Sequence, residues 1–223
     1  MLLSLLKKHQ SEFYPILGTS FRKMDFCKIN LNISAPNLDL ETIQTYDGLD
    51  FYIQNELKKQ EAKVGIGGYL EKRVLYQQSN NFKSEVENRD IHLGVDWWSA
   101  AGTEIYTPLD GKVHSFQYND LYLDYGATII LEYELEGLVF YTLYGHLNLA
   151  SLGHLRKGML IKKGNAFAAM GNRNENGGWV PHLHFQIIKD MMGKEGDFPG
   201  VTSERLLTEF SENCPDPNVF FVY

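Results

Sequence analysis

Residues 181–188 read PHLHFQII. Pro181 can begin a strand, because its missing N–H need not join a hydrogen-bond ladder. Alternate side chains of an extended segment point to opposite faces, so His182 and His184 should share one face while the apolar residues beside them fill the core. The stretch therefore predicts a core strand that presents two imidazole rings at one place.

The stretches before this strand also have β character. ATIILEYELEGLVFYTLYGHL, residues 127–147, predicts a hairpin that turns near Glu136-Gly137, and TEIYTPLDGKVHSF, residues 103–116, predicts two strands around a turn. The chain also holds 13 Tyr and 13 Phe, which favour sheet over helix. We expect residues 63–223 to form one mainly β domain of antiparallel sheet, folded as a partly barrel-like sandwich.

Residues 1–62 differ from the rest of the chain in their pattern of predicted helices and strands. A short helix is expected near the start, a half-buried strand over 29–33, and an amphipathic helix over 49–59. This part contains no motif that suggests catalysis or metal binding. We expect a small mixed α/β extension that packs on the main domain or contacts a partner.

Charge and cysteine content limit the possible partners and compartment. The formal net charge of −7 argues against a nucleic acid or an anionic membrane surface as partner. Cys27 and Cys214 are far apart in sequence and favour two free thiols over a disulfide. MLLSLLKKHQ has its charges after a short apolar run, unlike a secretory signal, so a cytoplasmic location is expected unless a leader is missing. The oligomeric state is left open.

A second histidine motif lies upstream, in IHLGVD, residues 91–96. His92 and Asp96 would be about 13 Å apart along a straight strand, too far to share one ion. The segment must therefore curl, and Gly94 permits a bend. Taken alone, the motif is more typical of a surface histidine and a turn aspartate than of a metal site.

His146 in LYGHL lies between these two motifs. We expect it to share a strand face with Tyr144, and by itself it would be a core histidine. Together, the motifs have the spacing of a three-ligand zinc site, which leaves a fourth position open for water, with a further histidine as proton carrier.

The motifs resemble the lysostaphin/LytM-type zinc metallopeptidases, which cut peptide cross-links of peptidoglycan. The resemblance spans about residues 65–190 and includes supporting positions around each motif, namely Gly68-Tyr69, Arg73, Ala101-Gly102-Thr103, Asp110-Gly111-Lys112-Val113 and Met170-Gly171-Asn172. NRDIHLGVD, DYG, FYTLYGHL and ENGGWVPHLHFQII look closer still to the peptidase-like segment of fusion proteins that join a kinase-like and a class III aminotransferase-like domain.

The resemblance implies a barrel-sandwich with a duplicated hybrid motif, and one zinc ion held by His92, Asp96 and His184. It makes His146 and His182 the catalytic histidines, acting as general acid and base around a zinc-bound water whose pKa is lowered to about 7. The implied activity is hydrolysis of a peptide amide bond in a muropeptide or another small peptide.

Some residues near the motifs depart from the family pattern, and an alternative function stays open. Gln186 stands where the family commonly has Glu, and the stretch before Pro181 also departs from the family pattern. Trp179 is a weak candidate for substrate contact. The alternative function is a catalytically silent module of the same fold that binds a peptide or a protein.

Overall fold

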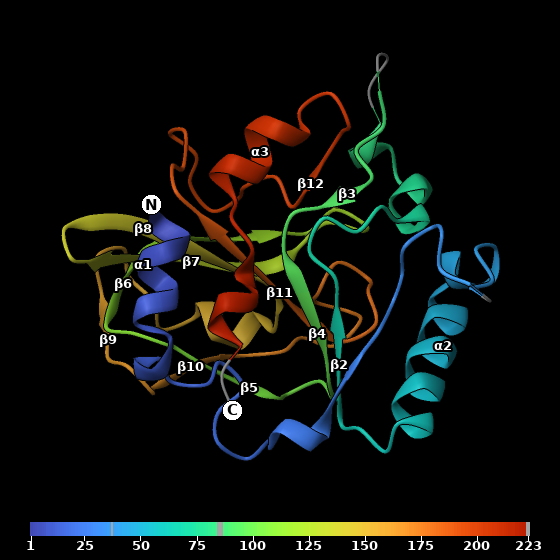
Figure 1. The fold of residues 1–223 in the computed structure, drawn as a ribbon, viewed down its shortest axis with the longest axis horizontal. Coiled ribbons are helices and arrows are strands. Elements are labelled where there is room, and N and C mark those ends of the chain that lie inside the picture. Colours follow the sequence, from blue (N-terminus) through green and yellow to red (C-terminus); the bar gives the residue numbers. More distant parts are fainter. Residues whose placement is uncertain (37, 84–86, 222–223) are drawn as a thin grey trace.

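The computed structural model describes residues 1–36, 38–83 and 87–221 (Figure 1). Its α-helices are α1 (Leu2–Lys8), α2 (Tyr46–Lys59) and α3 (Leu207–Asn213). None of the helices in the described ranges is long and apolar enough to cross a lipid bilayer.

An eight-stranded sheet dominates the molecule. Its strands lie in the spatial order β1 (Phe26–Lys28), β2 (Val64–Gly67), β4 (Val95–Trp98), β11 (His182–Ile188), β8 (Leu138–Leu147), β7 (Gly126–Leu135), β6 (Gly111–Asn119) and β9 (Leu160–Ile161). Two small sheets pair β5 (Glu104–Tyr106) with β10 (Ala166–Ala169) and β3 (Ile91–His92) with β12 (Val201–Thr202). The prediction of a mainly β fold is confirmed.

The large sheet is open and mixed. Its outer strands are β1 and β9, so it does not close into a barrel. All its neighbours run antiparallel except β1 and β2, which are parallel. The predicted strand over 181–188 is confirmed as β11, which lies between β4 and β8. The predicted hairpin is β7–β8, which turns at Glu136-Gly137.

Three hydrophobic clusters lie around β11 and its neighbours, and two of them include residues of the N-terminal part. The first contains Leu183 and Phe185 of β11 together with Leu2 and Leu6 of α1. The second contains the buried residues of α2 and several residues beside the histidine motifs, namely Leu49, Ile53, Leu57, Tyr76, Trp98, Leu123 and Trp179. The N-terminal 62 residues thus pack into these two clusters, and their strand β1 joins the main sheet.

The N-terminal part differs from expectation in one element. The predicted helix over 49–59 is α2, which begins earlier because Thr45 caps it by accepting from the Gly48 N–H. The predicted strand over 29–33 is wrong. The Leu31 N–H donates to a Glu71 carboxylate oxygen, a side-chain contact that interrupts any ladder at this position.

Candidate metal centre

The strand that carries His92 is interrupted before it reaches Asp96. β3 ends at His92 and β4 begins at Val95, so the chain turns at Leu93-Gly94. The turn brings His92 Nε2 to 3.2 Å from Asp96 Oδ1. The predicted curl is therefore confirmed. The glycine is needed here for space, since a Cβ on Gly94 would lie 2.6 Å from Cε1 of the His184 ring.

His184 completes a group of three potential metal ligands. Its Nδ1 lies 3.2 Å from Asp96 Oδ1 and 2.9 Å from His92 Nε2. All three residues are buried, and each offers one ligand atom within 4.8 Å of the other two. The backbone register explains this meeting, because His184 is paired directly with Asp96 across β11 and β4.

The chemistry of these atoms fits a zinc ion. Ligand atoms around a tetrahedral ion with bonds of about 2.0 Å are separated by about 3.3 Å, close to the spacing of these three atoms. Asp96 Oδ1 is buried and accepts no hydrogen bond from any described residue, which is costly unless a cation or water satisfies it. His92, Asp96 and His184 would therefore hold the ion.

His92 and His184 each make a hydrogen bond through the ring nitrogen that faces away from Asp96. These bonds determine which nitrogen of each ring is free to bind a metal. His92 Nδ1 lies 3.0 Å from the Gly68 carbonyl oxygen, which can only accept, so Nδ1 donates and Nε2 keeps its lone pair. His184 Nε2 lies 2.9 Å from Gln186 Oε1. Gln186 Nε2 in turn donates to the Pro199 carbonyl oxygen at 3.0 Å, which fixes the orientation of the amide. His184 Nδ1 is therefore the nitrogen that would bind an ion.

Replacing Gln186 by Leu should weaken zinc binding by about 10- to 100-fold, because His184 would lose the acceptor that sets its tautomer and ring orientation. Gln186→Glu keeps an acceptor and should stay within a few-fold of the wild type. Competition with a chromophoric chelator measures both affinities. Equal affinities for the wild type and Gln186→Leu would show that the amide has no part in holding the ion.

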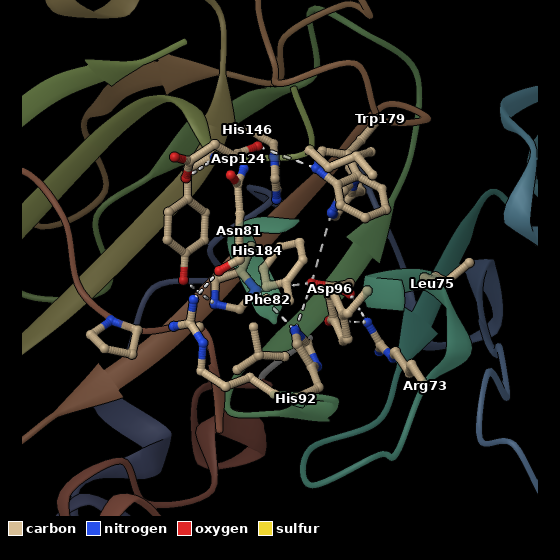
Figure 2. Close-up of a pocket in the computed structure, with 18 of the residues that line it drawn as sticks. Arg73, Leu75, Asn81, Phe82, His92, Asp96, Asp124, His146, Trp179 and His184 are labelled. Carbon is tan, nitrogen blue, oxygen red and sulfur yellow. Dashed lines mark hydrogen bonds and ion pairs between the residues drawn. The ribbon is translucent and has the colours of Figure 1, made fainter. Parts of the chain in front are cut away.

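Arg73 holds the other oxygen of Asp96. Its Nη1 donates to Asp96 Oδ2 at 2.5 Å, and its Nε donates to Glu71 Oε2 at 2.8 Å. Both pairs are buried. Burial alone would raise the pKa of Asp96, but nearby His92 and the Arg73 guanidinium hold it well below its usual range. The carboxylate is thus kept ionised, with Oδ1 turned toward the other two ligands (Figure 2).

The backbone of His146 departs from the regular strand. Its φ is +62°, in the left-handed region that non-glycine residues rarely adopt. Tyr144 packs on Phe185 in the core, whereas the His146 ring lies 4.2 Å from the His182 ring on the opposite face. The expectation that His146 shares a face with Tyr144 is therefore wrong, because the left-handed residue breaks the alternation of β8. Strain of this kind is typical of functional sites.

His146→Gly should be more stable than His146→Ala by about 0.5–1 kcal/mol, because glycine adopts a positive φ without steric cost. Chelator-treated variants compared by urea denaturation measure the difference. The same pair at Val139, an exposed residue of β8, is the control, and there alanine should be the more stable. Greater stability of the alanine variant at both positions would contradict strain at His146.

His146 and His182 are oriented in the same way. His146 Nδ1 lies 2.8 Å from the Asn176 carbonyl oxygen and His182 Nδ1 lies 2.7 Å from the Val180 carbonyl oxygen. Each Nδ1 therefore donates, and each Nε2 keeps its lone pair. His182 Nε2 lies 3.9 Å from Asp96 Oδ1, which places it beside the three ligand atoms.

Burial keeps these histidines neutral. It lowers the pKa of His146 well below its usual value, assisted by His182, and lowers the pKa of His182. It also lowers the pKa of His92 to about 4. At neutral pH the rings can bind a metal or accept a proton without first losing one.

A cavity adjoins these histidines, and Trp179, the weak candidate for substrate contact, is one of its lining residues. Trp98 also lines the cavity, while Trp97 packs in the core against Phe185. Several cavity residues carried no signal in the sequence that linked them to the motifs, namely Leu49, Tyr76, Phe82 and Leu123.

Comparison with known proteins shows what the chain is similar to. Residues 90–197 match the model of peptidase family M23. A search of curated proteins found no match.

Three solved structures illustrate the similarity. A zinc-containing peptidase from Vibrio cholerae is 30% identical over 47% of this chain and 29% of its own, with a TM-score of 0.36. The chain therefore spans less than a third of that protein. The catalytic domain of lysostaphin from Staphylococcus simulans is 21% identical over 61% of this chain and 97% of its own, with a TM-score of 0.38. LytU is 25% identical over 71% and 92%, with a TM-score of 0.41.

The matched segment contains the three potential metal ligands and the two histidines beside them. His92, Asp96, His146, His182 and His184 all lie between residues 90 and 197. The segment that forms this centre therefore matches peptidase family M23.

Proposed function

We propose that this protein is a zinc-dependent metallopeptidase that hydrolyses a peptide amide bond, in a muropeptide or another small peptide. One observation carries the proposal. Two buried neutral imidazoles, His146 and His182, adjoin three buried ligand atoms whose spacing suits one zinc ion. The match of residues 90–197 to peptidase family M23 supports the same conclusion.

The chemistry that zinc supplies at such a site is Lewis acidity toward a carbonyl group and a water molecule. His146 and His182 supply the proton transfers. The free Nε2 of a neutral ring accepts a proton from the attacking water and later returns one to the leaving amine. The resulting imidazolium also stabilises negative charge that develops on the carbonyl oxygen.

The surrounding residues position these groups. The carbonyls of Asn176 and Val180 hold the two rings, and Arg73 holds Asp96. Positioning by fixed backbone acceptors means that little reorganisation is required when a substrate binds.

The test combines metal content with cleavage. The protein purified without chelators should contain one zinc ion per chain and should cleave members of a peptide library or a peptidoglycan digest, followed by mass spectrometry. His184→Ala should lose both properties. Absence of zinc from the wild type would refute the proposal. Bound zinc and retained peptides without any cleavage would instead favour the silent binding module. The relation to the kinase and aminotransferase fusion proteins stays a prediction.

A further inference from the structure

The metal-ligand atoms lie in a cavity much larger than the reacting groups require. The cavity has a volume of about 400 Å³, within the range of pockets that bind small molecules. Besides the histidines it is lined by residues from α2, from 73–82, from the segment before β7, and from 179–201, together with Arg89. There is room for a substrate side chain as well as the amide.

Three aromatic residues, Trp179, Tyr76 and Phe82, form one wall of this cavity, here called the aromatic wall. The Trp179 ring centroid lies 6.1 Å from that of His146 and 6.3 Å from that of His182. The wall therefore begins beside the two proton-transfer residues.

The wall continues away from the histidines through ring contacts. Tyr76 lies 6.4 Å from Trp179 and 5.0 Å from Phe82 between centroids. Arg89 lies over the Phe82 ring at 5.8 Å. Trp179 is seen beside His146 in Figure 2. A side chain next to the scissile amide would meet this apolar surface.

The N-terminal extension supports the aromatic wall. Leu49 of α2 lines the same cavity. Leu49, Tyr76 and Trp179 belong to one hydrophobic cluster with Ile53 and Leu57 of α2. The extension thus completes the cavity and packs against the aromatic wall.

Charge gives the cavity little preference for a charged side chain. Its further lining residues include two cations, Arg89 and Lys194, and two anions, Asp124 and Asp197. Arg73 is already paired with Glu71 and Asp96. Apolar contact is the selective feature that remains.

We propose that the aromatic wall and Leu49 form a subsite for a large apolar or aromatic side chain adjoining the scissile amide. This rests on the proposed function, because the subsite is defined by its position beside the metal ligands. The preferred substrates would be peptides with such a residue at the cleaved bond.

Two hydroxamates test the subsite without requiring turnover, since a hydroxamate binds zinc directly. Acetohydroxamate has no side chain to fill the subsite, whereas 3-phenylpropanohydroxamate carries an aromatic ring. Calorimetry on the zinc-loaded full chain should give a Kd about 10- to 100-fold lower for the aromatic compound, the effect of burying one large apolar group. Phe82→Ala should reduce this ratio to a few-fold and leave the Kd of acetohydroxamate unchanged.

Phe51→Ala is the matched control, because Phe51 lies on α2 near Leu49 but is 70% exposed. It should preserve the full ratio. If Phe82→Ala does not fold, Phe82→Leu should reduce the ratio less but in the same direction.

Each other outcome has a distinct meaning. Equal affinities of the wild type for the two hydroxamates would overturn the subsite and leave the metal centre intact. A ratio unaffected by both Phe82 variants would overturn the assignment to the aromatic wall. Failure of both hydroxamates to bind the zinc-loaded protein would overturn the proposed function, and the subsite with it.

Discussion

Replacing His146 by alanine should lower kcat/KM for peptide hydrolysis by about 100- to 10 000-fold, the usual contribution of a positioned acid or base. Zinc content should remain at one ion per chain, because His146 is not among the three ligand residues. Metal analysis and cleavage kinetics on the same preparation separate the two effects. His154→Ala is the matched control, since His154 is exposed and lies outside the cavity.

The pH dependence of kcat/KM tests the role of His146 independently. A general base must be neutral, and burial lowers the pKa of His146 well below its usual value. The acid limb of kcat/KM should therefore lie below the pH of about 6.5 expected for an unperturbed histidine. Wild-type activity in His146→Ala would exclude His146 from proton transfer.

Replacing Arg73 by methionine should lower the free energy of unfolding by about 3–5 kcal/mol, the usual cost of removing one partner from a buried ion pair. Arg73 is 2% exposed and bridges the buried carboxylates of Glu71 and Asp96. Methionine would leave two buried anions close together without a counter-charge. Urea denaturation in the presence of a chelator measures this effect apart from that of the metal.

Lys72→Met provides the comparison for Arg73. Lys72 is the adjacent residue, but its side chain is 41% exposed and its nearest carboxylate oxygen is 3.6 Å away. An exposed pair of this kind contributes at most about 1 kcal/mol. If Arg73→Met cost no more than Lys72→Met, the buried bridge would have no special part in stability. Arg73→Lys keeps the charge and should fall between the two.

The sequence was sufficient for features that depend on neighbours along the chain. The period of two in PHLHFQII predicted that His182 and His184 share a face, and β11 has this arrangement. The distance between His92 and Asp96 along an extended chain required a turn, and the break between β3 and β4 supplies it. Both inferences use only the geometry of consecutive residues.

The same local rule failed for His146. Alternation predicted a common face with Tyr144, but the left-handed backbone at His146 turns its ring toward His182. No residue type in LYGHL predicts a left-handed backbone at His146. It is held by contacts with distant segments, including a hydrogen bond from the His146 N–H to the Tyr125 carbonyl oxygen.

The sequence by itself determined the mainly β fold and the residues that can bind a metal, because strand periodicity and ligand chemistry are properties of short segments. Only the tertiary structure decided what surrounds them. Arg73 reaches Asp96, and Leu49 of the N-terminal extension reaches the cavity, through packing between segments far apart in the chain. Such contacts depend on how whole elements pack, which spacing along the sequence does not encode.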